Sequence, residues 1–423
     1  MDTILAPQRR HSRFFERLLL NRKFQLLLGF TIVILFPTLF AWGWSFQGTP
    51  SRWATLLAML MAYWFALTTV QRMSRLPGTR AYLLSIPVTS VCFAVAFLML
   101  QFTNIEPDTD LYFTSFLLTT LFCTAGYWVG GRYRVLKLAV VPFGKAPELC
   151  HNHGVDWRRL SEPSLDSVRV DGVVADLRAQ LPAEWERFLA DCTLNRIPVY
   201  HSTTAYEQLT GRVQLSHLYE NRYGSLQPDE GYELLKRMLD FLAVIALLPL
   251  ALPLMAATAI AIRLESPGSV LFTQQRMGFH CRPFTVYKFR SMYIGHEGRG
   301  FTEDSEDSRI TRVGRVVRKY RLDELPQLFN VLKGDMSLIG PRPESMELAA
   351  WYQHDVAFFH YRHVVRPGIS GWAQVEQGYA AEVDGMNRKL EYDFYYIKNF
   401  SFWLDALIAI RTVKTVLTGF GSR

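Results

Sequence analysis

Two adjacent carboxylates, Asp323 and Glu324, have the residue types and the surroundings to act on a phosphate. They lie in the stretch RLDELPQLFNVLKGDMSLIGPRP, just after a basic run that includes Arg318. Carboxylates ringed by cations are poised to stay ionised, which suits a nucleophile or a metal ligand. A structural role explains the same residues, because Asp323 is well placed as a helix N-cap and Glu324 would complement the helix dipole. Spacing alone leaves both interpretations open.

Five cations in nearby segments are candidates for binding phosphate. Lys288 and Arg290 lie in an expected strand that alternates apolar and polar residues, and Arg318 lies in a basic amphipathic helix, RVGRVVRKYR. Arg342 and Arg366 stand in stiff Pro/Gly turns, GPRP and VRPGISGWAQV. A rigid arginine matches a phosphate bidentately and loses little entropy on binding. The alternative for each cation is an ion pair or a solvated side chain, and for the basic helix a surface that faces lipid headgroups.

The elements that must position these side chains belong to a chain with much membrane-like sequence. Its 423 residues are 49% hydrophobic, and the formal net charge is +8. A basic balance suits a cytoplasmic membrane face, phosphorylated ligands or nucleic acid, so it does not choose among them. The five cysteines are scattered without a CxxC pair and no HExxH motif occurs. We therefore expect neither a disulfide framework nor a zinc site.

Four apolar stretches of spanning length come first, at residues 24–46, 53–70, 81–103 and 111–129. A bilayer core about 30 Å thick needs about 20 helical residues, so each stretch qualifies, the second only just. Tryptophan and tyrosine mark their ends, as in an interface belt: Trp42, Trp44, Trp53, Tyr82, Tyr127 and Trp128. This pattern predicts a unit of four transmembrane helices over residues 1–130.

Basic flanks predict how this four-helix unit is oriented. They precede the first stretch, separate the second from the third, and follow the fourth: Arg9, Arg10, Arg13, Arg17, Arg22, Lys23, then Arg72, Arg75, Arg80, then Arg132, Arg134 and Lys137. The loop after the third stretch, NIEPDTD, is acidic. By the positive-inside rule, both ends of the unit lie in the cytoplasm, so the rest of the chain starts there.

The middle of the chain, residues 131–230, has the composition of a small α/β domain. VLKLAVVPFG, DGVVADL and IPVYHS have the pattern of strands, and PAEWERFLADCTLNR that of an amphipathic helix. This alternation predicts a parallel, Rossmann-like sheet. The phosphate cradle is degenerate, because VVPFG ends in the single Gly144 where a GxGxxG motif would stand. A structural or oligomerisation role is favoured over nucleotide binding.

A long apolar segment, residues 238–262, opens the last part of the chain. Its length suits a fifth span, but Pro249 and Pro253 lie in the middle, where each removes a backbone donor and bends a helix. Cations at both ends give no inside–outside asymmetry. A re-entrant helix over residues 236–263 that breaks at the prolines and returns to the same face satisfies both observations.

Several motifs that occur in order resemble a known family. YKFRSM, RLDELPQLFNVLKGDMSLIGPRP, RPGISGWAQV and EYDFYYIKNFSFWLDALIAIRTV follow the apolar segment that starts KRMLDF. Together they resemble the bacterial sugar transferases, monotopic polyprenyl-phosphate hexose-1-phosphate transferases that start O-antigen, capsule and exopolysaccharide assembly. The resemblance runs from Lys236 to the C-terminus, and the upstream part is similar to the large form of that family. One departure is Leu248-Pro249, where the family often has Ser-Pro.

The resemblance implies a mechanism. Asp323 would be the nucleophile on the sugar-linked phosphorus of a UDP-sugar, which expels UMP and leaves a phosphosugar on the aspartate. Polyprenyl phosphate would then take the phosphosugar. Mg²⁺ would bridge the pyrophosphate, with Glu324 and Asp323 as its ligands. Lys288, Arg290, Arg318, Arg342 and Arg366 would bind the substrates, and a re-entrant helix broken at Pro249 and Pro253 would hold the site at the membrane.

The resemblance also implies an architecture and a location. An α-rich, α+β monotopic catalytic domain would occupy residues 231–423, after the four-helix membrane unit and the α/β domain. The protein would lie in the bacterial inner membrane with this domain on the cytoplasmic face. Its partners would be the two substrates and inner-membrane lipids, with no nucleic acid, and the α/β domain is a candidate homodimer contact.

The same residues also fit two other functions. With water as the acceptor the same site would be a UDP-sugar hydrolase, although a hydrolase needs no site at lipid level. A membrane-anchored scaffold or sensor that binds UDP-sugar without turnover is the other candidate, and the intact Asp323-Glu324 pair argues against it. The residues do not distinguish glucose, galactose or an N-acetylated sugar as the transferred group.

Overall fold

The computed structural model divides the chain into two compact units, residues 1–211 and residues 212–423. The residues it describes are 21–43, 48–74, 76–79, 81–103, 105–133, 136–151, 154–165, 170–215, 227–294, 309–377 and 383–418. Seven of the basic residues that predict the orientation lie outside them: Arg9, Arg10, Arg13, Arg17, Arg75, Arg80 and Arg134. The orientation therefore stays a prediction, as do the domain boundaries expected at residues 130 and 230.

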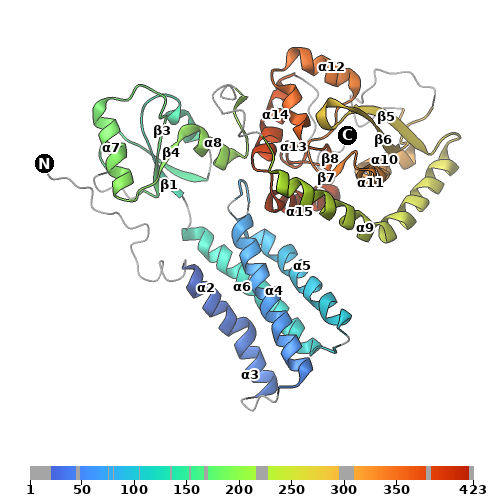
Figure 1. Cartoon of the computed structure of the whole chain (residues 1–423), viewed down its shortest axis with the longest axis horizontal. Coiled ribbons are helices and arrows are strands. Elements are labelled where there is room, and N and C mark those ends of the chain that lie inside the picture. The colour runs from blue at the N-terminus through green and yellow to red at the C-terminus, as the bar shows by residue number, and fades with distance from the viewer. Residues whose placement is uncertain are drawn as a thin grey trace. The chain divides into compact units, whose positions relative to one another are not determined.

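The first unit begins with apolar helices. The first expected span is one helical run made of α2 (Arg22–Phe30), a π-helical turn η1 (Thr31–Leu35) and α3 (Phe36–Trp42). It is followed by α4 (Pro50–Met73), α5 (Ala81–Phe102) and α6 (Thr109–Tyr133), as Figure 1 shows. α4 begins at Pro50 because proline suits the first helical turn and the Thr49 side chain caps the backbone N–H of Arg52.

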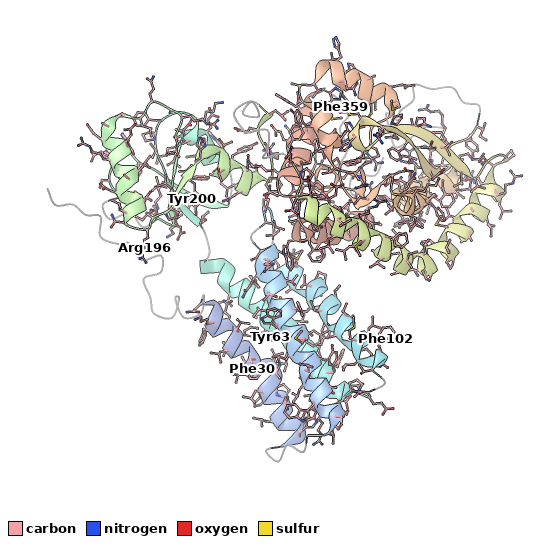
Figure 2. All side chains as sticks on the ribbon, in the orientation of Figure 1. Phe30, Tyr63, Phe102, Arg196, Tyr200 and Phe359 are labelled. Atoms are coloured by element: carbon pink, nitrogen blue, oxygen red, sulfur yellow. The ribbon has the colours of Figure 1, made fainter. Side chains whose placement is uncertain are left out.

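Buried side chains and hydroxyl pairs hold these helices together. Tyr63 lies inside the unit (Figure 2), where its hydroxyl donates a hydrogen bond to the Leu26 carbonyl oxygen at 3.1 Å. Between α5 and α6, the hydroxyls of Ser85 and Thr124 are 2.7 Å apart and those of Thr89 and Thr120 are 2.9 Å apart. Such hydrogen bonds help helices associate in lipid, because lipid tails are as apolar as the side chains and the hydrophobic effect does not drive helices together there.

Four described helices are long and apolar enough to cross a membrane: Lys23–Trp42, Pro50–Met73, Tyr82–Phe102 and Glu230–Glu265. The first three are the first three expected spans. α6, at the position of the fourth, has 25 residues and is not among these four. The length and apolarity of these helices indicate a membrane-anchored protein.

The α/β part of the first unit contains a four-stranded sheet in the order β2-β1-β3-β4. All neighbouring strands are parallel, as the sequence predicts: β1 (Leu136–Val140), β2 (Val155–Arg159), β3 (Gly172–Ala175) and β4 (Val199–His201). α7 (Ala183–Leu194) buries Trp185 and Phe188 against one face of the sheet, and α8 (Ser202–Thr210) buries Ala205 against the other. Both faces are covered, which is typical of parallel sheets.

In its described residues the second unit is rich in helices and holds two small sheets. The expected strand pair is an antiparallel hairpin of β5 (Leu271–Met277) and β6 (Pro283–Phe289), and β7 (Ser337–Ile339) pairs in parallel with β8 (Gly368–Ser370). Its helices are α9 (Glu230–Glu265), α10 (Arg312–Lys319), α11 (Gln327–Lys333), α12 (Met346–Asp355), α13 (Trp372–Glu376), α14 (Val383–Lys398) and α15 (Phe402–Thr418). The short turns are η5 (Phe279–Cys281), η6 (Leu322–Glu324) and η7 (Phe359–Val364).

α9 is a single helix of 36 residues with both prolines inside it. A straight helix of that length would measure about 54 Å, well beyond a hydrocarbon core of about 30 Å. Figure 1 shows the ribbon of α9 bending partway along its length, and the missing donors of Pro249 and Pro253 account for a bend. One face packs on β6 and α11 through Val244, Met255 and Ile262, while large apolar residues such as Leu250 are exposed.

A buried ionic cluster stiffens the core behind the hairpin. The Arg362 side chain is fully buried and lies 3.2 Å from Glu344 and 2.8 Å from Asp393, and Lys389 also contacts Glu344. Burial raises the pKa of Glu344, but Lys389 and Arg362 lower it further, to about 2. Removing one member of such a cluster strands a buried charge, so these residues fix the segments that carry them.

Candidate active site

The Asp323-Glu324 pair lies in the short turn η6, between α10 and α11. The residue before this turn, Arg321, has a left-handed backbone with φ 55°, an uncommon conformation for a residue with a side chain. The alternative N-cap role of Asp323 is wrong: α11 begins at Gln327, its N-cap position is Pro326, and no side chain caps it. The proline itself starts the helix, so both carboxylates are left for other contacts.

Glu324 is locked among cations. Its side chain is 7% exposed, its Oε1 lies 2.6 Å from Arg342 Nη2 and 3.5 Å from Lys288 Nζ, and its Oε2 lies 3.7 Å from Arg321 Nη1. Burial would raise the pKa of Glu324, but the positive charges of Arg342 and Lys288 outweigh it and hold that pKa well below its usual range. Glu324 is therefore ionised, as the sequence predicts.

Asp323 differs from its neighbour. No residue in the described ranges donates a hydrogen bond to its carboxylate or pairs with it. Burial and the adjacent Glu324 raise the pKa of Asp323 to about 6, and Lys288, Arg342 and Arg318 only partly oppose this. The expectation that both carboxylates are held ionised by cations thus applies less to Asp323, because Lys288 and Arg342 pair with Glu324 instead. What results is one fixed carboxylate beside one that is half-buried and has no partner among the described side chains.

Two of the cations that hold Glu324, Lys288 and Arg342, are placed by a strand and a tight turn. Lys288 belongs to β6, where the inward residue Val286 is buried in the core. Arg342 follows β7 in the GPRP turn, whose carbonyl groups accept bonds from Arg362 and Arg276. Gly340 starts this turn, and a Cβ atom there would lie 2.4 Å from the Arg366 carbonyl oxygen, so a larger residue would push β7 from β8.

The structure brings together five of the seven residues expected to form the site: Lys288, Arg318, Asp323, Glu324 and Arg342. Arg318, in the last turn of α10, acts on Asp323 through its charge. Arg321, at the end of the basic run that precedes Asp323, joins them through Glu324 and was a further candidate from the sequence. The sequence indicates this contact only through the spacing of three residues between Arg321 and Glu324. No sequence pattern predicts the left-handed backbone of Arg321.

Arg290 and Arg366 contact other parts of the second unit and not the carboxylate pair. The Arg290 guanidinium donates to the Ser266 and Pro267 carbonyl oxygens at 2.8 Å each, where it fixes the connection that follows α9. Arg366 pairs with Glu233 of α9 at 2.6 Å and lies over the Phe279 ring at 4.7 Å. Both contacts are structural, and neither touches the carboxylate pair.

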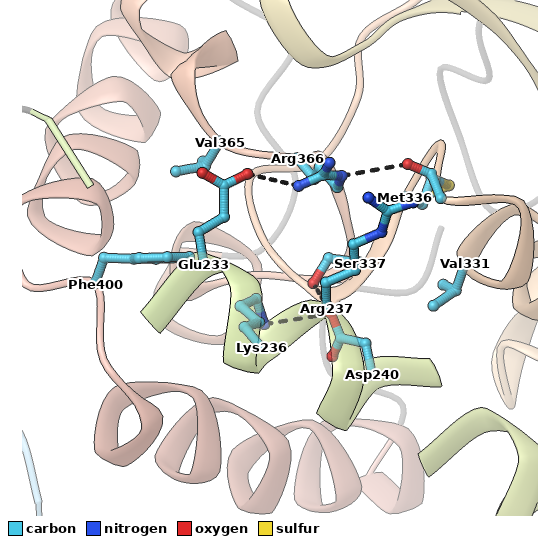
Figure 3. A pocket seen from close by; sticks show the side chains of 11 residues that line it. Glu233, Lys236, Arg237, Asp240, Val331, Met336, Ser337, Val365, Arg366 and Phe400 are labelled. Atoms are coloured by element: carbon cyan, nitrogen blue, oxygen red, sulfur yellow. Dashed lines mark hydrogen bonds and ion pairs between the residues drawn. The ribbon is translucent and has the colours of Figure 1, made fainter. Parts of the chain in front are cut away.

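Arg366 lines a small pocket at the start of α9, away from the carboxylate pair, which Figure 3 shows. Lys236 of the same helix lies 3.7 Å from Asp240 and 2.7 Å from Asp405 of α15, and the Ser337 hydroxyl at the start of β7 donates to Asp240 at 2.5 Å. These contacts attach the polar start of α9 to the elements that carry the GPRP turn. Pro249 and Pro253 lie further along α9 on its exposed side.

The carboxylates of Asp323 and Glu324 suit a magnesium site that is completed by the substrate. The described residues contain no group of three or more His, Cys, Asp and Glu side chains placed to hold a metal ion. Mg²⁺ commonly uses only one or two carboxylates and takes its other ligands from substrate phosphates and water. The open carboxylate of Asp323 beside Glu324 fits that pattern.

A carboxylate pair surrounded by cations, on a unit whose longest helix is apolar enough for a membrane, defines the class: a membrane-anchored enzyme that acts on anionic substrates. Residues 231–419 match the family model for bacterial sugar transferases. An Aeromonas hydrophila protein, UDP-N-acetylgalactosamine-undecaprenyl-phosphate N-acetylgalactosaminephosphotransferase, is 48% identical over 99% of this chain and 100% of its own length. The chain therefore belongs to the bacterial sugar transferase family.

Shorter matches agree with this assignment. The UDP-glucose:undecaprenyl-phosphate glucose-1-phosphate transferase of Xanthomonas campestris pv. campestris is 43% identical over 46% of this chain and 41% of its own length. The protein of the same name from Caulobacter vibrioides is 41% identical over 47% of this chain and 75% of its own length. The family indicated by the sequence motifs is thus confirmed.

Proposed function

We propose that this protein transfers a sugar 1-phosphate from a UDP-sugar to undecaprenyl phosphate, releases UMP, and so initiates O-antigen, capsule or exopolysaccharide assembly. The relatives' names support these substrates. The similarity that spans the whole chain favours N-acetylgalactosamine as the sugar over glucose. The observation that carries the proposal is the unequal carboxylate pair, in which Glu324 is held by Arg342 and Asp323 is open to a substrate.

In the first step, an Asp323 oxygen attacks the phosphorus that carries the sugar. The bond from that phosphorus to the bridging oxygen breaks, and UMP leaves with the electron pair. The product is an aspartyl phosphosugar. Asp323 must be ionised to attack, and its open, partly desolvated carboxylate is a stronger nucleophile than the paired Glu324.

In the second step, a phosphate oxygen of the polyprenyl phosphate attacks the same phosphorus. The bond to the Asp323 oxygen breaks, which restores the carboxylate and yields a polyprenyl diphosphate sugar. Arg318, Lys288 and Arg342 surround the reacting phosphates with fixed positive charge, so little reorganisation is needed as negative charge moves. Mg²⁺, held by Asp323 and Glu324 together with phosphate oxygens, would supply further charge neutralisation.

We further propose that α9 enters one leaflet, bends at Pro249 and Pro253, and returns to the same face. The prolines, the observed bend and the exposed apolar side chains of α9 support a re-entrant helix. The site would then meet the lipid phosphate at the cytoplasmic face of the inner membrane, where UDP-sugars are present. The exposed surface of α10 carries the basic residues Arg315 and Lys319 and the apolar residue Val316. This surface suits contact with anionic lipid headgroups.

For the middle of the chain we propose a degenerate Rossmann-like domain over residues 131–230 with a structural or homodimer-forming role. The parallel sheet covered on both faces supports the fold class. The four-helix unit would occupy residues 1–130 and the catalytic domain residues 231–423. Limited proteolysis in detergent micelles would test these boundaries, because cleavage concentrates in exposed linkers between domains.

The function is tested by UMP release from a panel of UDP-sugars with purified full-length protein in detergent. Reactions contain Mg²⁺, with or without undecaprenyl phosphate. We expect sustained UMP release that requires the lipid phosphate, with UDP-N-acetylgalactosamine preferred. Release that is sustained without lipid phosphate would indicate a hydrolase, and binding of UDP-sugars without any UMP would indicate a scaffold or sensor.

A further inference from the structure

A cavity of about 270 Å³ lies directly beside the carboxylate pair, and Glu324 and Arg321 are part of its wall. The wall comes from three parts of the second unit that are distant in sequence. They are the η6–α11 segment, β8 with α13, and α15. Its apolar members are Leu322, Leu325, Leu328, Ile369, Val375 and Val416. Nothing in the mechanism above uses this space.

The hydroxyls of Ser370, Thr412 and Thr415 in the wall are already hydrogen-bonded to the protein. The hydroxyls of Ser370 and Thr412 lie 2.6 Å apart, and Thr415 donates to the Arg411 carbonyl oxygen at 2.9 Å. Gln374 donates its amide to the Ile369 carbonyl oxygen, and its Oε1 is buried without a hydrogen-bond partner in the described part of the chain. A nucleoside would need donors and acceptors that face it, whereas these groups offer an incoming ligand an apolar surface.

We propose that this cavity holds the first isoprenoid units of the lipid phosphate acceptor, next to its phosphate. This inference rests on the proposed function. The phosphate would lie at Arg321 and Asp323, and the tail would extend over Leu325, Ile369 and Val416. The cavity is near the lower end of the ~300–1,000 Å³ typical of ligand pockets, so it takes only the units beside the phosphate and leaves the rest of the tail in the membrane.

One pair of variants on α15 tests the proposal. Val416 lines the cavity, while Val413, one turn earlier, is 60% exposed and does not. Val416→Phe should raise the KM for undecaprenyl phosphate by about tenfold or more, because each buried methylene displaced costs a factor of about four in affinity. The KM for the UDP-sugar should change less than twofold. The matched Val413→Phe variant should leave both constants unchanged.

The opposite pattern would overturn the proposal. A higher KM for the UDP-sugar with an unchanged KM for the lipid phosphate would assign the cavity to the nucleoside. Unchanged constants in the Val416→Phe variant would show that neither substrate enters it. Failure of the proposed function is separate, because the wild-type protein would then release no lipid-dependent UMP at all.

A second measurement avoids any question of whether the variant folds. Wild-type protein is irradiated with a benzophenone-bearing farnesyl phosphate, and the labelled peptides are identified by mass spectrometry. We expect labelling in α11 and α15, reduced by excess undecaprenyl phosphate. Labelling confined to other elements, such as the apolar length of α9, would overturn the proposal.

Discussion

Replacing Asp323 with asparagine should abolish turnover and also make the folded protein more stable. Burial and the neighbouring Glu324 raise the pKa of Asp323 from 3.8 to about 6. Each pKa unit corresponds to about 1.4 kcal/mol, so the ionised carboxylate lowers the free energy of unfolding by about 2–3 kcal/mol at neutral pH. Asparagine has nearly the same shape and no charge, so it removes this cost together with the nucleophile.

The pH dependence of this effect has a definite sign. Between about pH 4 and pH 6 the folded protein holds a proton on Asp323 that the unfolded chain has already lost. Wild-type stability therefore falls across that window relative to the Asp323→Asn variant, and below it the difference vanishes. Thermal unfolding of both proteins in detergent at pH 5 and pH 7.5 measures this. A gain of about 2 kcal/mol corresponds to roughly 4–8 °C in Tm for a unit of this size.

Glu324→Gln is the matched control, and its stability should change in the opposite direction. It removes the partner of Arg342 and Lys288, and breaking a buried pair in this way typically costs about 3–5 kcal/mol. If Asp323→Asn lowered Tm as Glu324→Gln does, both carboxylates would be ion-pair partners and the argument from their inequality would fail. Retained turnover in Asp323→Asn would place the nucleophile elsewhere.

Four other outcomes are expected. kcat/KM for UMP release should fall below about pH 6, where the raised pKa leaves Asp323 protonated; a profile that stays flat to pH 5 would contradict this. Arg342→Lys should lower kcat/KM at least tenfold by disturbing Glu324, whereas Arg290→Lys should lower Tm with little effect on the KM for the UDP-sugar. EDTA should stop UMP release and Mg²⁺ restore it; activity in EDTA would exclude the proposed ion. Asp405→Asn should lower Tm, because it weakens the 2.7 Å pair with Lys236, and an unchanged melting curve would show that this pair does not anchor α9.

Local sequence patterns predicted the elements that position the site. Alternation indicated the hairpin strand that carries Lys288, apolar spacing indicated the basic helix that carries Arg318, and the parallel sheet of the α/β part followed from strand–helix–strand order. These properties depend on residues close together in the chain, so periodicity reports them. The long apolar helix and its internal prolines were equally visible.

The sequence did not predict which carboxylate each arginine pairs with. Arg342 and Arg366 both stand in stiff Pro/Gly turns, yet one reaches Glu324 and the other Glu233, more than a hundred positions away in sequence. The N-cap interpretation of Asp323, one of the two that spacing left open, is wrong because α11 begins at Gln327 with Pro326 at its N-cap position. The wall beside Glu324 joins segments that meet only in the folded chain, so no spacing could reveal it.

The apolar surface of α9 has a practical consequence for biochemistry. Leu250 is 77% exposed and Leu264 is 82% exposed, and both belong to the second unit rather than to the N-terminal helices. A truncated protein that lacks the first 130 residues would therefore still expose a contiguous apolar surface and would still need detergent or a nanodisc during purification. Deletion of the N-terminal helices alone would not yield a water-soluble transferase.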